Sequence, residues 1–206
     1  MLFIKALFTT LLFLSLSFFA VSEDAIFYDD VGEQELIYFF SLHCESCYKV
    51  NASLSAFELS IAKSKKINIK KIPIIQKNWM FGARLYFLIE ASRNKHSLTK
   101  YERELTGYSI VANTLIENYP SFDYQYARIL RDNGMIFDAL EFKAWWEFSK
   151  VMIDSSLEVM SAVGMNNIKP PSIRFHSEGY VRWVYLNVND NKPENSLLSE
   201  LIEVVK

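Results

Sequence analysis

Cys44 and Cys47 are the only two cysteines of the chain, and they mark the point where an apolar segment gives way to a helical pattern. Residues 35–40 end in a continuous apolar run, which is typical of a strand buried on both faces within a sheet. From about residue 44 to residue 63, apolar residues recur at helical spacing without glycine or proline. Residues 66–72 then alternate polar and apolar, as in a strand. This succession predicts two parallel strands joined by a helix that begins at the cysteines.

A Cys-x-x-Cys pair at the start of a helix favours thiol chemistry. The free N–H groups and the positive end of the helix dipole stabilise the thiolate of Cys44, which makes its sulfur the better attacking and leaving group. Cys47 lies one turn further on, close enough to attack a mixed disulfide formed at Cys44. We therefore expect Cys44 to be the nucleophile and Cys47 to be the resolving thiol.

The first 22 residues have the pattern of a secretory signal peptide. Lys5 is followed by an apolar run up to Ala20, and the small residues Ala20 and Ser22 fit a cleavage site. The run is shorter than the roughly 20 residues that span a bilayer as a helix, so an uncleaved membrane anchor is the less favoured alternative. We expect cleavage after Ser22 and export to an oxidising compartment, where the two cysteines would form a disulfide with each other.

Two other uses of the cysteine pair compete with redox chemistry. A structural disulfide across so short a loop would stabilise the fold by only about 2 kcal/mol, and longer loops stabilise more. A zinc site needs about four ligands, and apart from His43 the chain offers only His96 and His176 as histidines. The spacing therefore favours a redox pair, and no metal is expected.

The rest of the chain divides into a helical block and a return to strands. Apolar residues repeat every three or four positions in a stretch with few breakers, which predicts four or five helices, at about 78–95, 98–118, 122–132, 135–148 and 149–163. Strands are predicted at 172–176 and 180–184, and a closing helix at 196–205. The expected organisation is a signal peptide (1–22), the first part of an α/β sheet domain (23–77), a helical insertion (78–164) and the second part of the sheet domain (165–206).

The string Phe-Phe-Ser-x-x-Cys-x-x-Cys-Tyr at residues 39–48 resembles the active-site region of the DsbA-like periplasmic thiol:disulfide oxidoreductases. Pro171, followed by a strand, a glycine turn and a second strand, resembles the cis-proline loop of that family. The resemblance implies an α/β, thioredoxin-like fold with an inserted all-helical domain. It also implies an enzyme, most simply a dithiol oxidase that introduces disulfides into secreted or periplasmic proteins through Cys44 and Cys47.

The same resemblance implies that Pro171 shapes a substrate-binding edge. A cis peptide bond before Pro171 would turn the chain sharply and bring backbone beside the cysteines, where a substrate peptide docks. A plain turn into the strand at Pro170 and Pro171 is the alternative. Since Pro170 has no N–H to pair with an extended substrate, we predict weaker or altered peptide docking at this edge.

Residues around the cysteines are expected to tune the redox pair. Glu45 and Ser46 stand where the best-known family member has proline and histidine, and a carboxylate beside Cys44 would raise the pKa of that thiol. His43 either supplies positive charge or is a half-exposed loop residue. Tyr38 replaces an acid that the same member buries. We predict that Cys44 is acidified below the free-cysteine value of about 8.5, but less than in the strongest oxidants, so the protein is a milder oxidant.

The formal charge of −2 argues against a general attraction to nucleic acid or anionic lipid. No cofactor is implied, because the dithiol itself carries two electrons. The resemblance implies cysteine-containing exported proteins as substrates and, for an oxidase, a membrane quinone-linked protein that reoxidises it; a monomer is expected. The alternatives are a disulfide reductase or isomerase of milder potential, and a redox-inactive peptide-binding adaptor. Such an adaptor would use aromatic residues of the helical block, such as Trp79, Phe81, Trp145 and Trp146.

Overall fold

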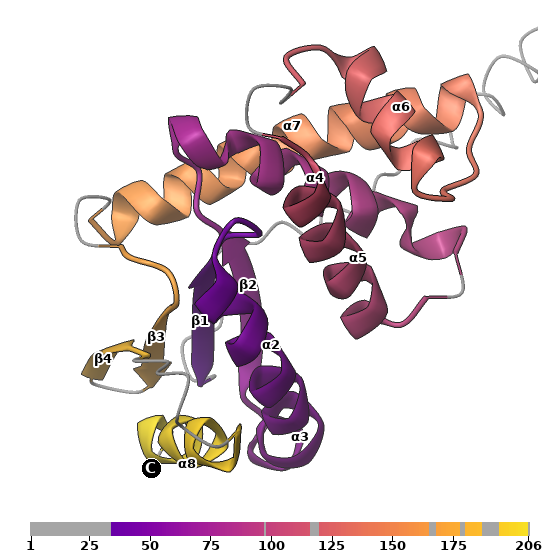
Figure 1. Cartoon of the computed structure of the whole chain (residues 1–206). Helices are drawn as coiled ribbons and strands as arrows, with labels where there is room; N and C mark the ends of the chain where they lie inside the picture. Colours follow the sequence, from indigo (N-terminus) through magenta and orange to yellow (C-terminus); the bar gives the residue numbers. More distant parts are fainter. Residues whose placement is uncertain are drawn as a thin grey trace, which may run out of the picture. The chain divides into compact units, whose positions relative to one another are not determined.

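The chain is described by a computed structural model that covers residues 34–96, 98–115, 120–164, 168–177, 180–186 and 194–205. The predicted signal peptide lies outside these residues. The cysteine motif follows a strand of a four-stranded sheet (Figure 1). The strands are β1 (Glu35–Phe40), β2 (Asn68–Pro73), β3 (Ser172–Ser177) and β4 (Tyr180–Tyr185), in the order β2-β1-β3-β4. β1 and β2 are parallel, as predicted, and β3 is antiparallel to both β1 and β4.

The central position of β1 explains its unbroken apolar sequence. Each residue from Leu36 to Phe40 is at most 2% exposed, because both faces of the strand are covered. On one face the rings of Tyr38 and Phe40 stack on each other, and on the other face Phe39 stacks on Trp183 of β4. This alternation directs Tyr38 toward the helix that carries the cysteines.

The helix predicted after the cysteines is present, but it is not uniform. It consists of α2 (Glu45–Phe57), a π-helical segment η1 (Glu58–Ala62) and α3 (Lys63–Lys65). Val50, Leu54 and Phe57 are spaced by four and three residues and form its buried stripe. Leu59 is 80% exposed because it lies two positions after Phe57, on the opposite side of the helix.

Between β2 and β3 the chain forms the predicted helical insertion. Its elements are η2 (Lys77–Trp79), α4 (Met80–Ala91), η3 (Ser92–Asn94), α5 (Lys100–Asn113), α6 (Asp123–Asp132) and α7 (Ala139–Ala162). α4 packs against α5 and α7, and it also contacts β2 (Figure 1). α5 contacts α2, so the insertion reaches the helix that carries the cysteines.

One helix boundary predicted within the insertion was wrong. The helices expected at 135–148 and 149–163 are a single helix, α7. The helix starts later than predicted because Asp138 and Glu141 form a capping box at its N-terminus. It continues through residue 149 because buried side chains recur every three or four positions along it: Phe142, Trp145, Ser149, Ile153, Ser156 and Met160.

The last described element is α8 (Glu194–Val204), which packs against α2. The guanidinium of Arg182 in β4 donates a hydrogen bond to the backbone carbonyl of Glu203, at 2.9 Å. The sheet, α2 and α8 therefore enclose one part of the core, and the helical insertion encloses another. Within the described ranges, no helix is both long enough and apolar enough to cross a membrane.

Candidate active site

Cys44 and Cys47 form a disulfide with their Cα atoms 5.2 Å apart. Cys44 is the N-cap residue of α2 and has an extended backbone. Its Sγ accepts a hydrogen bond from the backbone N–H of Cys47 at 3.1 Å. Cys47 is fully buried, whereas Cys44 is half-buried. Attack from outside can therefore reach Cys44 more readily, and the same N–H and helix N-terminus would stabilise a Cys44 thiolate.

The turn between β1 and α2 is held by Ser41. The backbone N–H of Cys44 donates to the carbonyl oxygen of Ser41 at 3.1 Å. The hydroxyl of Ser41 accepts the backbone N–H of His43 at 3.2 Å. Ser41 is buried, so both bonds are sheltered from water and fix the direction in which Cys44 leaves the strand.

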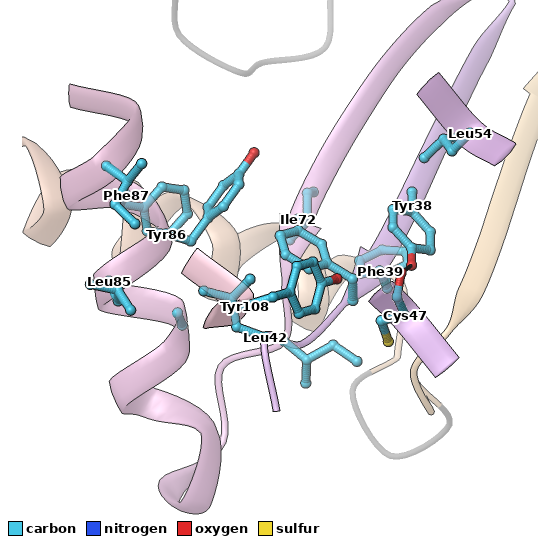
Figure 2. Packing of buried hydrophobic residues seen from close by; sticks show 14 of the residues in the cluster. Tyr38, Phe39, Leu42, Cys47, Leu54, Ile72, Leu85, Tyr86, Phe87 and Tyr108 are labelled. Carbon is cyan, nitrogen blue, oxygen red and sulfur yellow. Dashed lines mark hydrogen bonds between the residues drawn. The ribbon is translucent and has the colours of Figure 1, made fainter. Parts of the chain in front are cut away.

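Tyr38 supports the cysteine helix from the sheet. Its hydroxyl donates to the backbone carbonyl of Cys47 at 3.2 Å, which satisfies a buried acceptor at the start of α2 (Figure 2). Burial raises the pKa of Tyr38 well above its usual range, and the charge of Glu104 acts in the same direction. Tyr38 therefore remains a protonated donor. Tyr38 therefore places a neutral hydroxyl, and not the charge of a buried acid, at this position of the strand.

The peptide bond between Pro170 and Pro171 is cis. Pro171 is buried, and its carbonyl oxygen accepts the backbone N–H of Leu186 at 3.2 Å. The next residue, Ser172, pairs with Phe39 near the end of β1. Pro171 therefore lies at the end of the sheet from which the chain turns toward the cysteines. Its part in substrate binding stays a prediction.

The residues expected to tune the pair differ in their surroundings. The Glu45 side chain is 85% exposed and forms an ion pair with Lys49 at 3.4 Å, so water and this partner weaken its effect on Cys44. Ser46 is half-buried. The Nε2 atom of His43 accepts the backbone N–H of Gly82 at 3.2 Å, and burial lowers the pKa of the imidazole. This setting favours a neutral imidazole. The positive charge at His43, one of the two expectations from the sequence, is not favoured.

A groove of about 1180 Å³ opens beside Cys44. One wall comes from the segment around the cysteines, with Leu42 and Tyr48, and the other comes from Trp79 and from α5. The α5 residues that line the groove are Leu105, Tyr108, Ser109, Val111 and Ala112. Most of this lining is apolar or aromatic, so the groove suits an apolar segment of a polypeptide.

Of the four aromatic residues considered for a peptide groove, Trp79 alone is in the lining. Phe81 and Trp145 are buried in the core, and Trp146 packs against it. The α5 wall of the groove was not predicted, because no pattern within residues 100–113 indicates that they face the cysteines.

A buried ion pair beneath the cysteine helix was also missed. The ammonium of Lys71 in β2 donates to both carboxylate oxygens of Glu104 in α5, and to the Asn51 side-chain oxygen in α2, each at 2.8 Å. The Lys71 and Glu104 side chains are only 3% and 2% exposed. Burial lowers the pKa of Lys71, and Glu104 partly offsets this effect. Asn51 lies one helical turn after Cys47 on the buried side of α2, so the pair reaches the cysteine helix directly.

A sequence signal for this pair exists. In the alternating segment 67–72, Lys71 falls in phase with Ile67 and Ile69, where an apolar residue is expected. Glu104 likewise falls three, four and seven positions before Gly107, Tyr108 and Val111, on the buried side of α5. A lysine and a glutamate that both occupy apolar positions indicate a buried ion pair, although the pattern around one residue does not identify the other as its partner.

No group of three or more histidine, cysteine, aspartate or glutamate side chains suited to a metal ion occurs in the part of the chain that the structure describes. The fold and the cysteine pair together define the class: a thioredoxin-like fold with a helical insertion and a Cys-x-x-Cys disulfide at a helix start.

Comparison with solved structures agrees with this class. The chain is similar to the oxidoreductase DsbA from Xylella fastidiosa, with a TM-score of 0.58 and 13% identity over 85% of this chain and 86% of that one. The oxidoreductase NmDsbA1 from N. meningitidis gives 0.56 and 18%, over 87% of each chain. DsbA from Pseudomonas aeruginosa gives 0.55 and 11%, over 72% of each. No protein-family model and no curated protein sequence match the chain. At such identities the likeness concerns the fold, and it confirms the fold class that the residue patterns and the family resemblance predicted.

Proposed function

We propose that the protein is an exported thiol:disulfide oxidoreductase that acts through Cys44 and Cys47. The observation that carries the proposal is the position of Cys44: at the N-cap of α2, with the Cys47 N–H on its sulfur, and in the wall of an apolar groove. A purely structural disulfide needs neither a thiolate-stabilising helix end nor a groove beside it. The DsbA-like fold supports the same reaction.

Acting as an oxidase, the disulfide form would accept two electrons from a substrate. A substrate thiolate attacks Sγ of Cys44, the Cys44–Cys47 bond breaks, and the electron pair leaves on the sulfur of Cys47, which takes up a proton. A second substrate thiolate then attacks the substrate sulfur of the mixed disulfide. The Cys44 thiolate leaves, stabilised by the N-terminus of α2, and the substrate departs with a new disulfide.

We propose cysteine-containing secreted or periplasmic proteins as the substrates. The groove beside Cys44 would hold an apolar stretch next to the reacting cysteine, and the backbone at Pro170 and Pro171 would border the attacking chain. The signal-like segment 1–22 supports export to the periplasm. We also propose that the enzyme is a monomer and that a membrane quinone-linked protein reoxidises it.

The direction of electron flow depends on how well the reduced thiolate is stabilised. The helix N-terminus favours a Cys44 thiolate, whereas a neutral His43 and the carboxylate of Glu45 do not. We therefore propose an oxidase milder than the strongest ones, with a reductase or isomerase as the second candidate. A reduction potential measured in a glutathione series separates the two candidates, because strong oxidants have potentials of about −120 mV and reductants of about −270 mV.

The test uses the full chain and two single variants. Cys47→Ser is expected to accumulate a mixed disulfide with glutathione or a substrate peptide at Cys44, because no resolving thiol remains. Cys44→Ser is expected to accumulate much less at the buried Cys47. Mass spectrometry of the trapped species reads both. Equal trapping in the two variants would refute the assigned roles, and a Cys44→Ser protein that still oxidises reduced substrate would refute the proposed function.

A further inference from the structure

The loop that carries Cys44 is attached to the helical insertion through His43. Nε2 of His43 accepts the backbone N–H of Gly82, the third residue of α4, at 3.2 Å. The first N–H groups of a helix have no partner within it. Trp79, the N-cap residue of α4, makes no side-chain capping bond. His43, 39 residues earlier in the chain, therefore does for α4 what a local N-cap side chain usually does.

The start of α4 is shaped around the imidazole. A Cβ at Gly82 would lie 2.9 Å from both Cδ2 and Nε2 of His43, closer than real side chains approach, so any residue larger than glycine would displace the ring. Phe81 meets the ring edge to face, with the centroids 6.1 Å apart. The helix thus supplies a donor and an aromatic wall, and leaves room for an imidazole because Gly82 has no side chain.

We propose that His43 is a positioning residue for thiol–disulfide exchange: its imidazole ties the loop before Cys44 to the first turn of α4 and so fixes the sulfur at the end of α2. The proposal rests on the proposed exchange reaction. The backbone N–H of His43 is bound to Ser41 and its side chain to Gly82, so the residue before Cys44 is held from two directions. A sulfur held in one orientation meets an incoming thiolate in line more often, which speeds a displacement at sulfur.

The contact requires a neutral ring. An imidazolium has N–H donors on both nitrogens, so it cannot accept the Gly82 N–H, and the positive end of α4 repels it. Burial lowers the pKa of His43, which keeps the ring neutral at pH 7.

Four elements around the ring carry charged or titratable groups. Glu45 of α2 is exposed and paired with Lys49, and Lys77 of η2 and Tyr108 of α5 line the same groove. Arg84 of α4 donates to Ser149 of α7.

Since acid would protonate the ring, the attachment is present near pH 7 and is lost as the pH falls through the lowered pKa of His43.

Two substitutions of His43 separate the effect of its hydrogen bond from the effect of the size of its side chain. In His43→Gln the amide oxygen stands as many bonds from Cβ as Nε2 does, so it can accept the Gly82 N–H, but it does not titrate in this range. In His43→Phe the ring and its contact with Phe81 remain, but the acceptor is lost. The assay is the rate at which excess glutathione opens the Cys44–Cys47 disulfide of the full chain, followed from pH 7.5 to pH 4.5. Hydrogen exchange of the Gly82 amide, corrected for its intrinsic rate, reports the attachment itself.

At pH 7 we expect His43→Gln to retain the rate within about twofold, and His43→Phe to be about 2 to 12 times slower, which corresponds to the loss of one hydrogen bond. Gly82 exchange should be faster in His43→Phe by a similar factor. As the pH falls, the ratio of the wild-type rate to the His43→Gln rate should decline, since the thiolate fraction of glutathione is common to both and cancels. Gly82→Ala, which displaces the ring, should behave like His43→Phe.

Three results would overturn the inference. Equal rates for His43→Phe and wild type at pH 7, with Gly82 less protected in the variant, would show that His43 caps α4 without positioning Cys44. Unchanged Gly82 protection in His43→Phe would show that the hydrogen bond is not formed. A constant ratio of wild type to His43→Gln down to pH 4.5 would exclude release by protonation. None of these results depends on whether the protein oxidises substrates, so the proposed function fails or stands separately.

Discussion

Replacing Glu104 by glutamine is expected to lower the free energy of unfolding by about 3–5 kcal/mol. The carboxylate receives two of the three hydrogen bonds that the Lys71 ammonium donates, and both side chains are almost completely buried. Without the negative charge, the ammonium keeps its desolvation cost and loses the attraction that offset it. A domain of this size has a total stability of roughly 5–15 kcal/mol, so the loss is a large part of it.

The expected loss has a defined pH dependence. Burial lowers the folded-state pKa of Lys71, and Glu104 is the main group that raises it again. In Glu104→Gln the pKa therefore falls further below the unfolded value of about 10.4. Between the two pKa values the unfolded chain binds more protons than the folded chain, so stability rises with pH across that window. The penalty of the substitution should be largest at neutral pH and should shrink as the pH approaches 10.

Urea denaturation of the oxidised protein, followed by circular dichroism at low temperature, measures the effect by linear extrapolation. The matched control is Glu58→Gln, which breaks the pair between Glu58 and Lys100, whose side chains are 35% and 41% exposed. That control should cost no more than about 1 kcal/mol. The double variant Lys71→Met/Glu104→Met should lose much less free energy of unfolding than the sum of the losses in the two single variants. If Glu104→Gln cost no more than Glu58→Gln, the pair would not be desolvated and the reasoning would be refuted.

Two further predictions concern the helical insertion. Because α7 is continuous through its middle, Lys150→Pro should destabilise the protein by about 3 kcal/mol and Lys150→Gly by about 1 kcal/mol in the same assay; a proline tolerated there would indicate a helix boundary near residue 149. Burial raises the pKa of Tyr126 to about 12, so its phenolate should form only near that pH in an absorbance titration. The unfolded chain loses this proton near pH 10, so stability should fall as the pH rises from about 10 to 12, and Tyr126→Phe should reduce that fall.

Local patterns predicted most of the elements because their causes lie within a few residues. The continuous apolar run of β1 indicated a strand covered on both faces, and the spacing of Val50, Leu54 and Phe57 indicated a helix with one buried side. The boundary inside α7 was misplaced for a related reason. Periodicity shows that a segment is helical, but residues 148 and 149 include no glycine or proline, and the hydroxyl of Ser149 donates to the carbonyl oxygen of Trp146 instead of capping a new helix.

The candidate site shows the same division. The cysteine pair, its place between strand and helix, and the proline before β3 were visible in the chain. The attachment of His43 to Gly82 was not, because the two residues lie 39 positions apart in the chain. The apolar groove likewise depends on α5, whose residues meet the segment around Cys44 through packing alone.

The sequence by itself determined the reactive groups, which are two thiols at the start of a helix. It also determined that the preceding strand is central and that the α/β fold carries a helical insertion. The tertiary structure decided the surroundings of that chemistry. It brought Glu104 to Lys71 across 33 residues, and it set His43 against the first turn of α4. The physical reason is that secondary structure and helix-end effects act over a turn or two of chain. Desolvation, charge compensation and the wall of a groove instead depend on which distant side chains exclude water from a group.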